Sequence, residues 1–124
     1  MLKTLLKDWD ELAPGEVSFD YEDTCLRLNK NTKMYGLCSI DTSSDLLPYE
    51  QDTLQGYLQR CIENRGWAYK VGFDGEHYAV VHDLSDLITA DSAVEALLTA
   101  YLTTLGAQMN ALSLEEESDA KPKP

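Results

Sequence analysis

A chain of 124 residues with 44% hydrophobic residues can form one domain with a buried core, which excludes wholesale disorder. The formal net charge of −12 argues against nucleic acid and anionic membranes as partners, because binding to either depends on lysine and arginine. No run of about 18 apolar residues occurs, so no membrane-spanning helix is expected. Three widely spaced cysteines, an odd number, indicate reduced thiols in a cytoplasmic protein: Cys25, Cys38 and Cys61.

The first half of the chain predicts a helix, a group of strands and a second helix. Apolar residues at three- and four-residue steps indicate a helix over residues 1–12. Alternating apolar residues indicate a strand over residues 17–21, followed by strands over residues 24–28 and 34–40 on either side of a turn. Pro48 suits the first turn of the second helix, which we expect to end near Arg65.

The strongest local pattern is a β-hairpin over residues 66–81. Asp74-Gly75 separates two alternating runs, and this dipeptide favours a two-residue hairpin turn. Such a turn places Tyr69 opposite Val80. It predicts one core face that consists of Trp67, Tyr69, Val71, Phe73, Tyr78 and Val80.

A long amphipathic helix follows, and we expect Thr89 or Asp91 to cap its N-terminus. No charged residue occurs between Ala96 and Leu114, which is unusual for a helix with a solvated face. Small residues form a second stripe along the helix: Ala96, Ala100, Thr103, Thr104 and Ala107. Two interpretations are open. Either the helix lies between the sheet and another element of the same chain, or the stripe is the interface of a homodimer.

The predicted order is helix, strands, helix, hairpin, helix. This order indicates an α+β fold in which helices pack on a small antiparallel sheet. We assign residues 1–112 to a single domain. Residues 113–124, an acidic stretch followed by Lys-Pro-Lys-Pro, are expected to form a disordered tail.

Acidic residues are concentrated in the second half of the chain. Residues 71–120 contain no lysine or arginine, whereas residues 1–70 contain both signs of charge. The acids of the hairpin and of the following segment form the candidate partner-binding surface: Asp74, Glu76, Asp83, Asp86, Asp91 and Glu95. Such a surface would attract a basic surface of another protein. The alternative is that these acids only keep the protein soluble.

No enzyme motif stands out. His77 and His82 are five residues apart on the predicted strand, so they point to opposite faces and cannot share a metal ion through it. Asp41-Thr42-Ser43 resembles the Asp-Thr-Gly of aspartic proteases, but serine replaces the glycine and we interpret the segment as a turn. We therefore expect no catalytic activity, no cofactor and no metal.

Residues 48–106 combine three features. Tyr49 and Asp52 lead an amphipathic helix, Gly66-Trp67 begins a strand, and residues 89–98 form an alanine-rich segment that starts with Thr-Ala and ends with Leu-Leu. In these features the chain resembles small phage and prophage proteins with an ABA sandwich domain.

The chain departs from the family pattern at Asp91 and Ser92, where such proteins have Pro and Glu. The segment is also one residue short before the two leucines. The resemblance implies a phage origin, and hence the cytoplasm of a host cell, together with a fold. It implies no reaction, since the family has no established catalytic activity.

Together these features predict a non-catalytic, acidic binding protein. We expect a phage-encoded accessory factor that inhibits or modulates a host protein, including one that handles nucleic acid or serves in defence. One alternative is a structural protein that assembles with itself through the last helix. Another is a small-ligand-binding module with a pocket under Trp67, Tyr69 and Tyr78.

Overall fold

The computed structural model describes residues 2–20, 25–28, 32–35, 47–82 and 87–120. In chain order its elements are α1 (Leu2–Leu12), β1 (Val17–Asp20), β2 (Cys25–Leu28), β3 (Thr32–Tyr35), α2 (Pro48–Asn64), β4 (Tyr69–Phe73), β5 (His77–Val81), β6 (Ile88–Ala90) and α3 (Ala93–Ala120). The predicted α+β class is confirmed. The strands form two antiparallel sheets, however, β1-β2-β3 and β4-β5-β6, rather than one.

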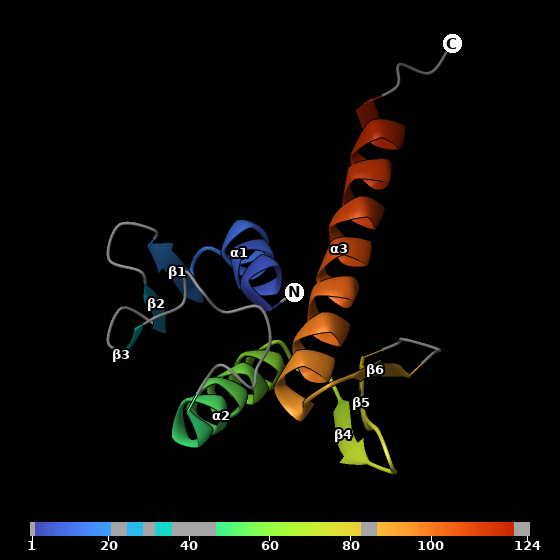
Figure 1. The fold of residues 1–124 in the computed structure, drawn as a ribbon. Coiled ribbons are helices and arrows are strands. Elements are labelled where there is room, and N and C mark those ends of the chain that lie inside the picture. The colour runs from blue at the N-terminus through green and yellow to red at the C-terminus, as the bar shows by residue number, and fades with distance from the viewer. Residues whose placement is uncertain (1, 21–24, 29–31, 36–46, 83–86, 121–124) are drawn as a thin grey trace.

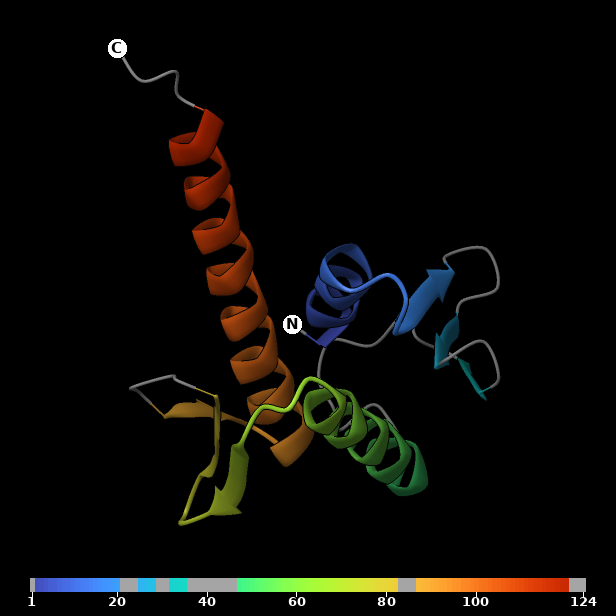
Figure 2. The same cartoon turned by 180° about the vertical axis from the view of Figure 1, so that it is seen from behind.

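The other elements are arranged around α3 (Figure 1). This helix contacts α1, α2 and all three strands of the β4-β5-β6 sheet, whereas β1 contacts α1. Figures 1 and 2 show the two sheets on opposite sides of the helices, and the C-terminal part of α3 extending beyond the rest of the fold. The first half of this long helix is therefore enclosed by its own chain.

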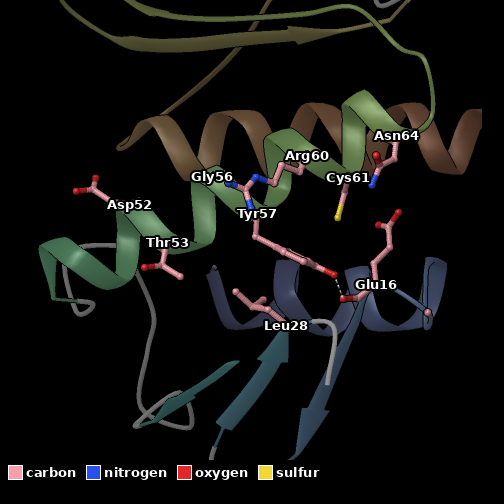
Figure 3. A pocket seen from close by; sticks show the side chains of 10 residues that line it. Glu16, Leu28, Asp52, Thr53, Gly56, Tyr57, Arg60, Cys61 and Asn64 are labelled. Carbon is pink, nitrogen blue, oxygen red and sulfur yellow. Dashed lines mark hydrogen bonds between the residues drawn. The ribbon is translucent and has the colours of Figure 1, made fainter. Parts of the chain in front are cut away.

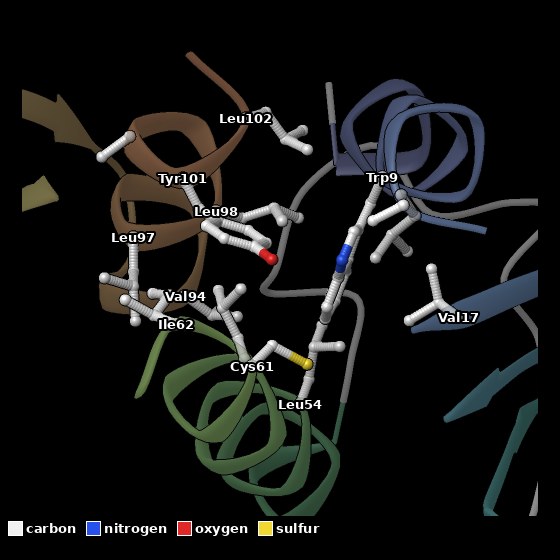
Figure 4. Close-up of a cluster of buried hydrophobic side chains, with 14 of the residues drawn as sticks. Trp9, Val17, Leu54, Cys61, Ile62, Val94, Leu97, Leu98, Tyr101 and Leu102 are labelled. Atoms are coloured by element: carbon white, nitrogen blue, oxygen red, sulfur yellow. The ribbon is translucent and has the colours of Figure 1, made fainter. Parts of the chain in front are cut away.

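One hydrophobic core joins the three helices to both sheets. Trp9 and Tyr101 are its largest side chains and are fully buried. Figure 4 shows Leu54, Leu97 and Leu98 in the same cluster. Buried leucines of all three helices belong to the core, among them Leu2, Leu6, Leu54, Leu58, Leu97 and Leu98. Each such side chain contributes roughly 1.5–3 kcal/mol by leaving water. This core explains why the apolar periodicity of the sequence locates the helices correctly.

The register of the hairpin differs by one residue from the prediction. Tyr69 pairs with Val81, not with Val80, so the loop has three residues, Asp74 to Glu76, instead of two. Gly75 has a φ of 78°, and the Asp74 N–H donates to the Glu76 carbonyl at 3.0 Å. A loop of this length also needs a left-handed residue, so Asp-Gly fits both lengths and does not decide between them.

The shifted register reverses the side chains of β5. Ala79 and Val81 are fully buried, while Tyr78 and Val80 lie on the opposite face of the sheet, because side chains alternate along a strand. The predicted core face is therefore wrong at Tyr78 and Val80. It is also wrong at Phe73, which is 65% exposed. The other three predicted members, Trp67, Tyr69 and Val71, are half-buried against the core.

Two predicted boundaries in the first half also differ. β3 begins at Thr32, inside the predicted turn, and the rest of the predicted strand, residues 36–40, lies outside the described residues. The Asp-Thr-Ser segment at residues 41–43 lies outside them as well.

The segment before α3 contains a strand that we did not predict. Ile88 and Thr89 pair with Ala79 and Tyr78 as part of β6. The helix is capped by Ser92, whose hydroxyl accepts a hydrogen bond from the Glu95 N–H at 3.2 Å, so the predicted cap at Thr89 or Asp91 is wrong. At its other end, α3 continues to Ala120, past the predicted start of the tail, and residues 121–124 lie outside the described part.

Candidate functional site

Three of the predicted partner-binding acids are exposed at one end of the β4-β5-β6 sheet. Asp74 and Glu76 belong to the hairpin loop, and Asp91 follows β6. His77 pairs with Phe73 on one side and with Ala90 on the other, which brings the loop and the end of β6 together. We call Asp74, Glu76 and Asp91 the acidic end of the sheet.

An open hollow of about 480 Å³ lies at the acidic end. Its lining has acidic, aromatic and small residues and no lysine or arginine: Phe73, Gly75, Glu76, His77, Thr89, Ala90 and Asp91. The Phe73 ring contacts the His77 ring edge-on, with centroids 4.8 Å apart. An exposed aromatic ring beside carboxylates offers both an apolar contact and a charge contact to a partner.

Of the other three predicted acids, one is described by the structure and does not extend this surface. Glu95 is 4% exposed, so its assignment to the surface is wrong. It lies in the first turn of α3 between buried neighbours, Val94 and Ala96. Asp83 and Asp86 lie outside the described residues.

The stripe of small residues on α3 is partly buried by the chain itself. Ala96, Ala100 and Thr104 are at most 5% exposed, and the Thr104 hydroxyl lies 3.3 Å from the carbonyl of Val81 in β5. A helix can approach a sheet this closely where its side chains are small. The predicted dimer contact is therefore wrong at these three residues. Thr103 is exposed, as is Ala107, and homodimerisation stays a prediction.

A polar cluster around Glu16 joins all three helices and was not predicted. Its carboxylate accepts hydrogen bonds from the Trp9 indole N–H at 2.8 Å and from the Tyr101 hydroxyl at 2.7 Å. It also forms an ion pair with Arg65 at 3.3 Å. The Tyr57 hydroxyl donates a hydrogen bond to the backbone carbonyl of Glu16 (Figure 3).

These contacts shift the pKa values of two members of the cluster. Burial and the hydrogen bond to Glu16 raise the pKa of Tyr101. Burial by itself lowers the pKa of Arg65, but its hydrogen bond to Tyr101 and its interactions with Glu16 outweigh that effect and raise the pKa. Both groups therefore keep their ordinary protonation state at neutral pH. The hydrogen bonds and the ion pair of the cluster connect the three helices.

A second hollow, of about 690 Å³, lies between α2 and the turn that carries Glu16 (Figure 3). Its lining is mixed in charge: Gly15, Glu16, Leu28, Asp52, Thr53, Gly56, Tyr57, Arg60, Cys61 and Asn64. The pocket predicted under the hairpin aromatics does not coincide with it. Trp67 instead stacks on His82, with ring centroids 5.0 Å apart, and Tyr69 hydrogen-bonds Glu63 of α2.

Cys61, which lines this hollow, has a thiol whose pKa is raised. Burial and the nearby Glu16 carboxylate raise its pKa to about 11 from 9.0, despite opposing effects of Tyr57 and Arg65. Thiolate nucleophilicity therefore requires strongly alkaline conditions.

We expect the stability of the fold to decrease as pH rises from 9 to 11. In that window the unfolded thiol is ionised while the folded thiol still holds its proton, so the unfolded state is favoured increasingly. Urea unfolding at a series of pH values measures this, and Cys61→Ala should reduce the slope. An unchanged slope in that variant would contradict the assignment to Cys61.

Among the described residues no three His, Cys, Asp or Glu side chains are placed to hold a metal ion. No helix in the same part of the chain is long and apolar enough to cross a membrane. Comparisons with protein families, with curated proteins and with solved structures find no match to the chain. The resemblance of residues 48–106 to the phage ABA sandwich proteins therefore stays a prediction.

Proposed function

We propose that this protein is a non-catalytic binding protein that attaches to a basic surface of another protein through the acidic end of the β4-β5-β6 sheet. One observation carries the proposal. Phe73 is exposed beside Asp74, Glu76 and Asp91, in a segment of the sequence without lysine or arginine.

Two physical arguments support this function. Clustered carboxylates repel one another and slightly destabilise the fold, so a binding role offers a reason for their placement. Opposite charges on a partner would accelerate association, while Phe73 would be buried at the centre of the contact and slow dissociation. The resemblance to phage proteins further implies that the protein is an accessory factor which inhibits or modulates a host protein.

The test compares two triple variants with the same change in net charge. The site variant carries Asp74→Asn, Glu76→Gln and Asp91→Asn. The control carries Asp8→Asn, Glu11→Gln and Asp52→Asn, away from the acidic end. A partner captured from host lysate with the wild-type protein is purified, and its association rate with each variant is measured at low and high salt.

We expect the site variant to associate at least about tenfold more slowly at low salt and to lose most of the salt dependence. The control should stay close to the wild type. Equal rates for the two variants, or binding that does not respond to salt, would contradict the proposal.

A further inference from the structure

The outer edge of β4 presents backbone groups that the hairpin does not use. The His82 N–H donates to the Ala68 carbonyl at 2.7 Å, and the Asp74 N–H donates to the Glu76 carbonyl. Hydrogen-bonded pairs alternate along an antiparallel ladder, so the backbone groups of Lys70 and Gly72 also point toward β5. Those of Tyr69, Val71 and Phe73 consequently point away from the sheet.

This edge carries only one of the usual protections of an edge strand. Proline, a bulge or a charged side chain, especially lysine, normally limits further pairing; β4 has no proline, and the exposed Lys70 is its one charged residue. Within the described residues, no hydrogen bond reaches the outward backbone groups of Val71 and Phe73. Helix α2 meets the strand at its start, through the hydrogen bonds of the Tyr69 hydroxyl with Gln59 and Glu63.

The strand keeps a regular conformation in spite of its glycine. The ring of Tyr78 covers Gly72 so closely that a Cβ atom there would lie 2.5 Å from the tyrosine hydroxyl oxygen. An aromatic side chain across from a glycine supports an edge strand at its weakest position. The far end of the hairpin also points away from the helices in both views (Figures 1 and 2).

We propose that the partner adds an extended, basic segment to the outer edge of β4 and continues the sheet by one strand. This inference rests on the proposed function and gives it a mode of binding. Main-chain hydrogen bonds to Val71 and Phe73 supply affinity, and carboxylates at both ends of the strand supply the preference for basic side chains. Glu63 lies at one end, bonded to Tyr69, and Asp74 at the other.

The same carboxylates disfavour a second copy of the chain as the occupant. Antiparallel pairing of two β4 strands about Val71 would bring Asp74 of each copy to the end where the other carries Glu63. Like charges at both ends of such a pair repel each other, whereas a basic strand meets attraction at both.

The test uses three short synthetic peptides and the full chain. One peptide alternates lysine and valine, the second has the same sequence with N-methylated amides, and the third replaces lysine by glutamate. Binding is followed by amide chemical shifts, and hydrogen exchange is measured at Val71 and Phe73.

We expect the lysine peptide to bind and to protect both amides from exchange. The N-methylated peptide should bind at least about tenfold more weakly, because backbone hydrogen bonds are lost. The glutamate peptide should not bind.

A matched pair of variants examines the protein side. Val71→Pro removes an outward N–H that the hairpin does not need, and an edge strand tolerates proline at such a position. Val71→Ala removes the same packing contacts but keeps the N–H. The proline variant should lose binding of the lysine peptide and the alanine variant should retain it. If the proline variant does not fold, the comparison of the methylated and unmethylated peptides on the wild-type protein tests the backbone pairing instead.

Two results would overturn strand addition. Equal affinity of the methylated and unmethylated lysine peptides would mean that charge attraction, and not backbone hydrogen bonding, accounts for the binding. Absence of binding by the unmethylated lysine peptide would also refute it, and the function would then be judged separately by the charge variants and the captured partner.

Discussion

Ala100→Glu is expected to unfold most of the protein. Ala100 is fully buried within the core cluster, and a carboxylate introduced there meets an apolar environment. An uncompensated buried charge costs several kcal/mol, which is comparable to the total stability of about 5–15 kcal/mol of a typical domain. Far-ultraviolet circular dichroism and urea unfolding measure the result.

Ala107→Glu is the matched control, because Ala107 is exposed on the same helix. Its effect on the free energy of unfolding should stay within about 0.5 kcal/mol. A folded Ala100→Glu protein that has changed from dimer to monomer would contradict this account of α3. It would show that the stripe of small residues faces a second copy.

Glu16→Ala is the second substitution with a large expected effect. It removes the acceptor of the Trp9 indole N–H and of the Tyr101 hydroxyl, and the ion-pair partner of Arg65. Each buried donor left without an acceptor costs about 1–3 kcal/mol. We therefore expect a loss of at least about 2 kcal/mol in the free energy of unfolding, measured by urea titration.

Glu11→Ala, an exposed change on α1, serves as the control and should be nearly neutral. Glu16→Gln keeps one acceptor oxygen and should cost less than the alanine variant. A double-mutant cycle of Glu16→Ala with Tyr101→Phe, in which each single variant removes the hydrogen bond, should show coupling of about 0.5–3 kcal/mol. Additive effects in that cycle would mean that the hydrogen bond contributes little to stability.

The local pattern predicts the elements well and their pairing less well. Apolar periodicity locates α1 and α2 because each buries one face, and Asp74-Gly75 locates the hairpin. The register depends on whether the loop has two or three residues, and the dipeptide allows both. The three residues of β6 are too few for a strand pattern, and two of them, Thr89 and Ala90, fall at the predicted start of the last helix.

The same distinction holds for the candidate sites. Asp74, Glu76 and Asp91 are visible in the sequence as acids near a hairpin, since their exposure follows from local structure. The burial of Glu95 follows from how α3 packs on other elements, which no local pattern contains. The Glu16 cluster is even harder to predict from the sequence, because Tyr101 is separated from Glu16 by 85 positions.

Amide hydrogen exchange of the complex with the captured and purified partner tests the central claim most directly. The account predicts slower exchange on binding at the outward amides of β4, in the loop of residues 74–76 and at Asp91. The second hollow, between α2 and the turn at Gly15, should exchange as in the free protein. Protection confined to α2 and that turn, with the hairpin unchanged, would contradict binding through the acidic end of the sheet.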